Sequence, residues 1–357
     1  MKKTKNYKKT LVLDMGNRYI RCVVGRLYSG TIKVDTTFSI PLDEGIYENG
    51  VILDSGRLCS AIVSNLRLHH VKVKNCVVVT ESREILKRII SVPRIAESDI
   101  KNMLKYEIGQ YLPIDLEDYI LQYHILGTSE EEEGKVDVEI VVMPKEIAKS
   151  HFDLLLNVNL KPVALDLKSA CMLRLLNACN ELDYDKVYAT LDVDYEKTEI
   201  NIIEGNQIRL NRIIGSGLKD FNTVLANNNI TDRVKIRQIY DAVSQYGLVN
   251  YNIGMEELGI VIDDQLYSDI ITFFTDLMSQ IERVFKYFTS RSLFNSIDQT
   301  IIYGNLSMVN KIDSFFESNT NSPTMIFQPC NINVCDCELT GSEFPLYVVA
   351  LGGLLKK

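Results

Sequence analysis

The sequence has 357 residues, of which 46% are hydrophobic and 24% charged, values typical of a globular chain with room for two or three domains. Its formal net charge of -8 argues against general nucleic-acid binding, because that activity requires a basic face that displaces counterions from phosphates. No apolar run reaches the roughly 18 residues that a membrane-spanning helix needs, so none is predicted.

The first nine residues form a basic tail, because five of them are lysines. The apolar stretch that follows, 10–16, is too short for the hydrophobic region of a signal peptide and is interrupted by Asp14. Two interpretations stay open. The tail is either simply solvated, or weakly attracted to an anionic membrane surface at about 1 kcal/mol per lysine.

A first unit of strands with one helix is predicted at the N-terminal end. Short apolar segments between turn residues predict its four strands, at 10–13, 19–25, 31–38 and 75–79, and the third of them alternates at Ile32 and Val34. A helix at 56–69 places Leu58, Ile62 and Leu66 on one face. The first strand ends on the sequence Asp14-Met15-Gly16-Asn17-Arg18, directly before a hairpin.

A different module follows. It begins with a strand at 84–92 and a helix at 97–111, which Pro113 ends. Strands at 119–126 and 136–143 flank a loop with four consecutive glutamates, and a helix at 145–156 closes the module. The simplest interpretation of the glutamates is a solvated loop tip.

A second unit starts at Lys186 and repeats the first. Its three strands are predicted at 187–191, 197–203 and 207–214. The first of them ends on Asp192-Val193-Asp194-Tyr195, so Asp192 stands in the position that Asp14 has in the first unit. Gly215-Ser216-Gly217 then precedes a helical stretch.

The rest of the second unit is mainly helical. The predicted elements are helices at 232–245, 263–290 and 310–318, strands at 299–303, 325–327 and 332–334, and a closing apolar element at 344–355. The strand at 299–303 runs into Gly304-Asn305. The helix at 263–290 carries an aromatic and aliphatic stripe that is typical of core packing.

Eight cysteines are scattered along the chain, and Cys330, Cys335 and Cys337 form a cluster. A structural zinc site needs four ligands, and neither a second cysteine pair nor a histidine stands near this cluster. We therefore expect reduced thiols and no metal there.

Two hairpins that face each other across a cleft can hold the phosphates of a nucleotide. Backbone N–H groups at hairpin tips bind anions, and glycine permits the close approach. An aspartate at each strand end can bind Mg²⁺, usually through water. The pattern therefore predicts Asp14 and Asp192 as the magnesium side of such a clamp.

The segment LDMGNRYIRCVV resembles the first phosphate motif of the actin-like superfamily. The segment SVPRIAESDIKNMLKYEIGQYLPIDLEDYILQYHIL, with its Tyr111-Leu112-Pro113 turn, resembles the inserted subdomain of the PilM family of type IV pilus assembly proteins. An insertion at this point also matches the 1C subdomain of the division protein FtsA. The resemblance implies an α/β, actin-like (ribonuclease H-like, duplicated) two-lobed fold with an inserted α+β subdomain. The implied boundaries are 1–81 plus 159–185 for the first lobe, 82–158 for the insertion and 186–357 for the second lobe.

The resemblance also implies a nucleotide site, which this chain only partly preserves. The implied residues are Asp14, Gly16, Asn17, Arg18, Asp192, Asp194, Gly217, Gly304 and Asn305. Asp194 replaces a glycine of the family, and a carboxylate about 4 Å from a phosphate charge costs roughly 4 kcal/mol at an effective dielectric constant near 20. Asp194 acting instead as a metal ligand stays open as an alternative. Asn305 replaces a second glycine, so we expect weak binding of ATP and Mg²⁺ without meaningful turnover.

As for function, the resemblance implies a cytoplasmic adaptor at the inner face of the cytoplasmic membrane. It implies binding of the N-terminal tail of an inner-membrane PilN-like protein, contact with the pilus assembly ATPase and a homo-oligomeric ring. The alternatives are an active actin-like ATPase or sugar-kinase-like enzyme, for which no catalytic base is evident, and an FtsA-like filament-forming protein. The last is disfavoured because no linker or amphipathic helix follows Leu354-Leu355-Lys356-Lys357.

The predicted helix at 97–111 has apolar residues on more than one stripe, namely Met103, Leu104, Tyr106, Ile108 and Tyr111. Two of its faces could pack internally, or Tyr106 or Tyr111 could border a groove for the partner peptide. A groove of this kind is expected where the first lobe, near 75–79, meets the inserted module, near 86–111.

Overall fold

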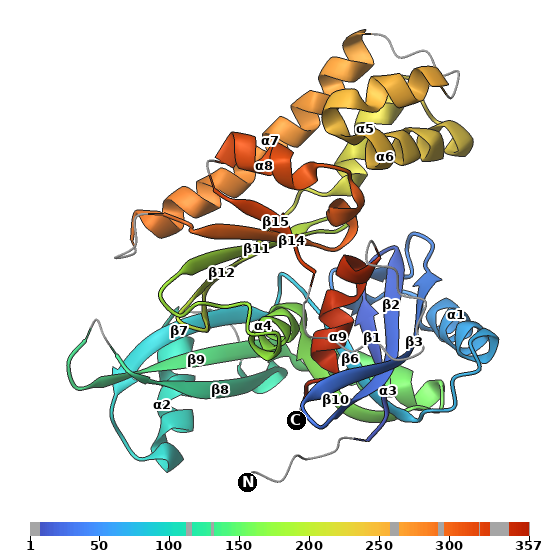
Figure 1. Ribbon diagram of the computed structural model, residues 1–357. Helices are drawn as coiled ribbons and strands as arrows, with labels where there is room; N and C mark the ends of the chain where they lie inside the picture. Colours follow the sequence, from blue (N-terminus) through green and yellow to red (C-terminus); the bar gives the residue numbers. More distant parts are fainter. Residues whose placement is uncertain are drawn as a thin grey trace.

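The computed structural model describes residues 8–356 except 112–115, 130–131, 258–263, 292–295, 321 and 329–342. Two five-stranded sheets form the two lobes (Figure 1). The first has the order β10-β6-β1-β2-β3, with β1 Thr10–Met15, β2 Tyr19–Tyr28, β3 Thr31–Pro41, β6 Asn75–Thr80 and β10 Lys161–Leu167. The second has the order β13-β12-β11-β14-β15, with β11 Val187–Val193, β12 Thr198–Glu204, β13 Gln207–Ile214, β14 Gln299–Tyr303 and β15 Thr324–Ile326.

The pairing of the strands confirms the predicted duplication. Strand β1 pairs antiparallel with β2 and parallel with β6, and β11 pairs in the same way with β12 and β14. In each sheet one more parallel strand follows at the edge, β10 in the first and β15 in the second. The predicted two-lobed α/β fold is therefore confirmed.

Helices cover both faces of the first sheet. Helices α1 (Ser55–Leu68) and α3 (Lys145–Asn157) pack on one face. Helix α1 begins at Asp54, whose carboxylate accepts a hydrogen bond from the backbone N–H of Arg57 at 2.9 Å, and it buries the predicted Leu58 and Ile62. Helices α4 (Lys168–Ala178) and α9 (Val348–Gly353) pack on the other face.

The second lobe packs its own helices on the outer face of its sheet. These are α5 Leu218–Asn227, α6 Arg233–Glu257, α7 Asp264–Thr289 and α8 Ile312–Thr320. Helix α7 buries the apolar stripe predicted from the sequence, including Ile270, Phe274 and Ile281. Gly247 interrupts α6 with φ 77°, shortly after the predicted end of that helix at residue 245.

The inner face of the second sheet meets the first lobe through α4 and α9, which lie between the two sheets (Figure 1). One buried cluster joins Val12 of β1, Leu175 of α4 and Leu351 of α9 with Tyr188 of β11 and Ile301 of β14. The two lobes therefore share a hydrophobic core, and α4 and α9 are its central elements.

The inserted subdomain forms a separate small sheet with the order β7-β9-β8, from β7 Leu86–Pro93, β8 Tyr119–Thr128 and β9 Lys135–Pro144. Helix α2 (Glu97–Tyr111) packs Ile100, Leu104 and Ile108 on one face of this sheet. Helix α3 instead places Leu154 and Leu155 in the core of the first lobe. We propose to draw the inserted subdomain at 86–144 rather than 82–158 for this reason, and to assign α9 to the first lobe.

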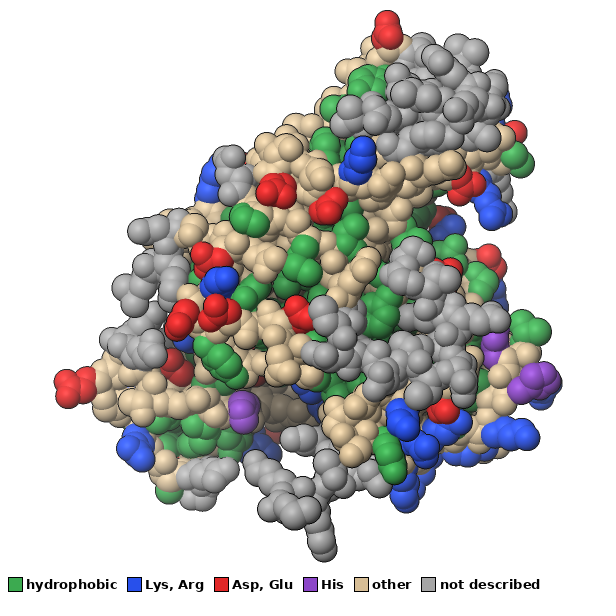
Figure 2. Space-filling model, viewed as in Figure 1, with side chains coloured by type: hydrophobic (Ala, Val, Ile, Leu, Met, Phe, Trp, Pro, Cys, Tyr) green, Lys and Arg blue, Asp and Glu red, His purple; other side chains and the backbone are tan. Residues whose placement is uncertain are grey.

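Sequence analysis did not predict β10 or α4. The cysteine cluster, the strand expected at 332–334 and Pro113 lie outside the described residues. Within the described ranges, no helix is both long and apolar enough to cross a membrane. Figure 2 shows Lys and Arg side chains gathered on the lower part of the first lobe, while acidic side chains and further Lys and Arg are scattered over the rest of this face.

Candidate functional site

The parallel strands of both sheets end around one point between the lobes. Asp14 stands near the end of β1, Lys168 follows β10, Asp192 lies near the end of β11, and Gly304 follows β14. Ligand sites of open α/β sheets form where strands end in this way. Here the ends enclose a cavity of 30 Å³ lined by Asp14, Gly16, Tyr19, Arg21, Lys168, Asp192, Asp194, Tyr303, Gly304, Asn305, Leu346 and Val349.

The prediction that Asp14 and Asp192 face a common cleft is confirmed. Gly16, Asp194, Gly304 and Asn305 line the same cavity. The left-handed residue of the β14 turn is Gly304, with φ 76°, whereas Asn305 uses its side chain to accept a hydrogen bond at 3.0 Å from Arg21 of the first lobe.

The other predicted residues, Asn17, Arg18 and Gly217, lie outside the cavity, and the first two contact the second hairpin. The amide of Asn17 donates to Glu196 at 2.6 Å. Arg18 pairs with Glu44 at 3.4 Å, and its guanidinium lies 4.8 Å from the centre of the Tyr195 ring. Gly217 packs against the backbone of the second hairpin, where a Cβ atom would lie 2.6 Å from the carbonyl oxygen of Asp194. The two hairpin tips are therefore in direct contact.

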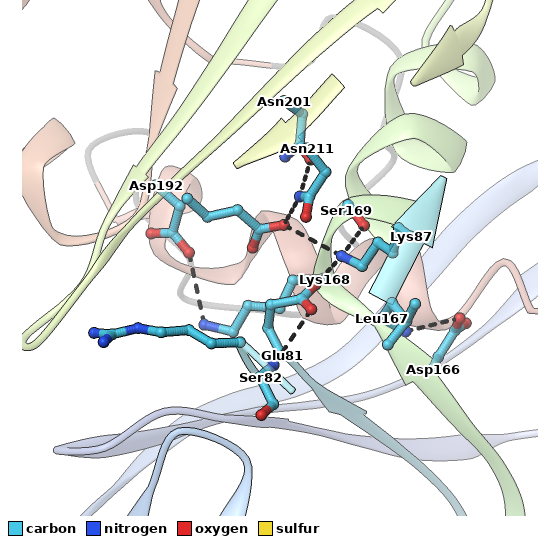
Figure 3. Close-up of polar contacts among 12 residues, drawn as sticks. Glu81, Ser82, Lys87, Asp166, Leu167, Lys168, Ser169, Asp192, Asn201 and Asn211 are labelled. Atoms are coloured by element: carbon cyan, nitrogen blue, oxygen red, sulfur yellow. Dashed lines mark hydrogen bonds and ion pairs between the residues drawn. The ribbon is translucent and has the colours of Figure 1, made fainter. Parts of the chain in front are cut away.

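A buried lysine occupies the centre of the carboxylate cluster. The ammonium nitrogen of Lys168 lies 3.6 Å from Asp192 (Figure 3). It also lies 3.7 Å from Asp14 and 3.7 Å from Asp194. Only 5% of the residue is exposed. Burial alone would lower the pKa of Lys168, but the surrounding carboxylates outweigh it and hold that pKa well above its ordinary value. The lysine therefore stays charged.

For the carboxyl groups of Asp14 and Asp192, the effect of burial on the pKa outweighs the attraction of Lys168. Burial raises the pKa of Asp192 to about 7 against the attraction of Lys168, and the charges of Asp194 and Asp14 add to the rise. Burial also raises the pKa of Asp14. The charge of Lys168 thus does not fully offset the burial of the Asp14 and Asp192 carboxylates.

This closed arrangement does not fit a bound Mg-nucleotide. Pockets for small molecules usually measure about 300–1,000 Å³, and a cavity of 30 Å³ has room for little more than water. The carboxylate of Asp192 also packs onto Gly304 so closely that a Cβ atom there would lie 2.2 Å from its Oδ1. Nucleotide binding requires the lobes to separate and Lys168 to move.

A second buried cluster joins the inserted subdomain to both lobes (Figure 3). The ammonium of Lys87, on β7, donates to Glu81 at 2.5 Å and to Ser169 at 2.8 Å, and lies 3.7 Å from Glu199 of β12. Lys197 donates to the carbonyl oxygen of Glu81 at 2.8 Å. Burial raises the pKa of Glu81 to about 7, opposed by Lys87.

Sequence analysis missed Lys168, Glu81, Lys87 and Glu199. The sequence does carry a signal for Lys168 and Glu81, because each directly follows an apolar strand. Asp14 and Asp192 stand in similar places, near the ends of their own strands. Lys87 and Glu199 lie within strands, where alternation assigns them to an ordinary polar face. No local pattern separates them from solvated residues.

The residues predicted for the peptide groove are placed as follows. Tyr106 is 69% exposed on the outer side of α2, and the side chain of Tyr111 lies outside the described residues. Cys76 to Val79 of strand β6 are buried, so these residues offer no surface to a groove, and the expected groove between the first lobe and residues 86–111 stays a prediction. A groove of 670 Å³ lies between α2, the start of β8 and the start of α3, lined by Lys101, Lys105, Glu117, Asp118, Tyr119, Ile120, Leu121 and Lys145.

Comparisons with known proteins agree with this architecture. A solved structure described as a PilM-PilN type IV pilus biogenesis complex matches with a TM-score of 0.79 and 20% identity, over 97% of this chain and 97% of that chain. Ethanolamine utilization protein EutJ from Carboxydothermus hydrogenoformans matches with a TM-score of 0.55 and 12% identity, over 99% of this chain and 91% of that one. Component A of the Acidaminococcus fermentans (R)-2-hydroxyglutaryl-CoA dehydratase matches with a TM-score of 0.50 and 9% identity, over 98% and 97% of the two chains.

These likenesses show the fold. The sequence itself matches the family model described as type IV pilus assembly protein PilM over residues 12–356, which is nearly the whole chain. The match includes both hairpins, the inserted subdomain and the shared core of the two lobes. This chain therefore belongs to the PilM family of type IV pilus assembly proteins.

Proposed function

We propose that this chain is a cytoplasmic adaptor of the type IV pilus assembly machine, held at the inner face of the cytoplasmic membrane by the N-terminal tail of a PilN-like protein. The observation that carries the proposal is the likeness to a PilM-PilN complex over 97% of both chains. Contact with the assembly ATPase and formation of a homo-oligomeric ring belong to the same proposal.

The groove of 670 Å³ supports a site for such a tail. It lies where the inserted subdomain meets α3 of the first lobe, and the ammonium of Lys145 donates to the backbone carbonyl of Glu117 across this junction. Tyr119, Ile120 and Leu121 supply apolar surface beside charged side chains, which is the combination that captures a short extended peptide. Tyr106 follows Lys105 on α2 and is proposed as a border residue.

The first test is a calorimetric titration with a synthetic peptide that has the N-terminal sequence of the PilN-like protein encoded beside this chain. We expect Ile120→Asp to weaken binding roughly thirtyfold, because losing a central apolar anchor commonly costs about 2 kcal/mol. Ile125→Asp is a matched control, since Ile125 lies on the same strand with the same 36% exposure but does not line the groove. Equal losses in both variants would place the site elsewhere.

Weak nucleotide binding is a further part of the proposal. The carboxylate of Asp194 lies close to the first hairpin. A Cβ atom on Gly16 would lie 3.5 Å from Oδ2 of Asp194. A phosphate at that hairpin would meet this negative charge, so its repulsion opposes binding.

We expect calorimetry with Mg-ATP to give a Kd weaker than micromolar for the wild type, and at least tenfold tighter binding for Asp194→Gly, by relief of about 1.4 kcal/mol or more of repulsion. Asp14→Ala is the companion variant. Sub-micromolar binding by the wild type that Asp14→Ala abolishes would contradict the expectation. Weaker binding by Asp194→Gly would identify Asp194 as a metal ligand instead.

A further inference from the structure

The contacts of Lys168 differ from those of an ordinary buried ion pair. Its ammonium nitrogen is nearly equidistant from carboxylate oxygens of Asp14, Asp192 and Asp194, at 3.6–3.7 Å. All three distances exceed the usual length of a hydrogen bond, about 2.7–3.2 Å. The lysine thus sits at the centre of three carboxylates as a spherical cation would, and these carboxylates come from both lobes.

Without the three carboxylates, a charged lysine at this place in the fold would be energetically unfavourable. It is the first residue of α4, and the partial positive charge of a helix N-terminus disfavours a cation there. Full burial adds the cost of removing an ammonium group from water. The three aspartates must offset both terms, so their combined attraction is what fixes the lysine.

The cluster also holds buried oxygen atoms that make no hydrogen bond. Among the described residues, these are the hydroxyl of Tyr303 and Oδ1 of Asp14, which faces the ammonium of Lys168 at 3.7 Å, too far for a hydrogen bond. Tyr303 is 1% exposed, and both groups line the cavity around Lys168. Oxygen atoms from carboxylates, a hydroxyl and water are the ligands that hard divalent cations take.

We propose that the ammonium of Lys168 takes the place of a divalent metal ion in this cleft. The chain supplies its own cation, which bridges Asp14 of the first lobe to Asp192 and Asp194 of the second and keeps the lobes closed. A divalent ion binds these carboxylates only when that ammonium is removed or displaced. This inference does not depend on the PilN-like partner, because no residue of the proposed groove takes part in it.

The test is a titration of the full chain with Mn²⁺ alone, followed by electron paramagnetic resonance of the free ion. We expect Lys168→Ala to bind about one Mn²⁺ per chain at least tenfold more tightly than the wild type does. Lys168→Ala combined with Asp192→Asn should lose this gain. Lys219→Ala is the control, because Lys219 pairs with Glu196 at 3.2 Å outside the cavity and should leave Mn²⁺ binding unchanged.

The thermal unfolding midpoint is a second measurement, and it also shows whether each variant is folded. In Lys168→Ala, millimolar Mn²⁺ should raise the thermal unfolding midpoint by several degrees more than in the wild type, because metal binding stabilises the folded state alone. If that variant does not fold with or without Mn²⁺, Lys168→Gln, which keeps most of the side-chain volume, carries the same expectations. Wild-type Mn²⁺ binding as tight as that of the lysine variant would overturn the proposal, as would a folded lysine variant that gains none.

Discussion

A variant that lacks the outer part of the inserted subdomain is expected to bind the PilN-like peptide at least a hundredfold more weakly than the wild type. In this variant an Asn-Gly turn joins Arg88 directly to Ile140, and residues 89–139 are absent. Arg88 and Ile140 face each other in the antiparallel pair β7 and β9, so a two-residue turn can close the hairpin. Helix α2 and strand β8, which form most of the proposed groove, are removed.

Residues 88 and 140 were chosen as the ends of the deletion because the contacts that hold the two lobes together then remain. Lys87 remains on the shortened β7, so Glu81 and Glu199 keep their buried partner. Helix α3 also remains, because Leu154 and Leu155 belong to the core of the first lobe. Circular dichroism and the thermal midpoint report whether the two lobes stay folded.

The outcomes distinguish a wrongly placed groove from a wrong adaptor proposal. If the shortened variant is folded and binds the peptide as tightly as the wild type, the groove lies elsewhere on the lobes. If the intact chain binds no peptide at all, the adaptor proposal loses its main support. Asp14→Ala should bind the peptide like the wild type, since Asp14 lies outside the proposed groove.

The second large effect is expected in the core between the lobes, where Gly352→Ala should lower the free energy of unfolding by about 3 kcal/mol. A Cβ atom at Gly352 would lie 2.1 Å from the carbonyl oxygen of Cys171, which is backbone of α4 and cannot turn aside. The substitution must therefore push α9 away from α4. Thermal or urea unfolding followed by circular dichroism measures the loss.

Gly109→Ala provides the matched control. Gly109 lies within α2, and a Cβ atom there would meet nothing within 4 Å. Alanine is a better helix former than glycine by about 1 kcal/mol, so this variant should be as stable as the wild type or slightly more stable. A Gly352→Ala protein as stable as the Gly109→Ala protein would show that α9 is not tightly held.

The duplicated sheet could be predicted because its signals are local. The first strand of each hairpin is a short apolar run with an aspartate near its end, and β1, β2, β11 and β12 form where the sequence predicts them. The bounds of α2 also agree with the prediction, since its apolar spacing is helical and Pro113 lies just beyond it. Local chemistry alone is sufficient for these elements.

Strand β10 and helix α4 were missed because their role depends on distant parts of the chain. Helix α4 is apolar on several sides, since it packs between both sheets, and so it lacks a single amphipathic stripe. Lys168 was missed for a related reason. A lysine is almost never buried unless it is paired, and its partners Asp14 and Asp192 belong to different lobes.

The position of α9 affects how the protein folds as it is synthesised. Gly353 packs against Val12 and Val79, so the chain must pass through the whole second lobe before it returns to complete the core of the first. Contacts between residues so far apart in sequence form slowly, because a long loop must close before they contribute. During synthesis, the part of this sheet face that α9 covers beside α4 therefore stays exposed until residues 348–353 emerge. A nascent chain in that state is prone to aggregate, and a chaperone that covers this face would raise the yield of folded protein.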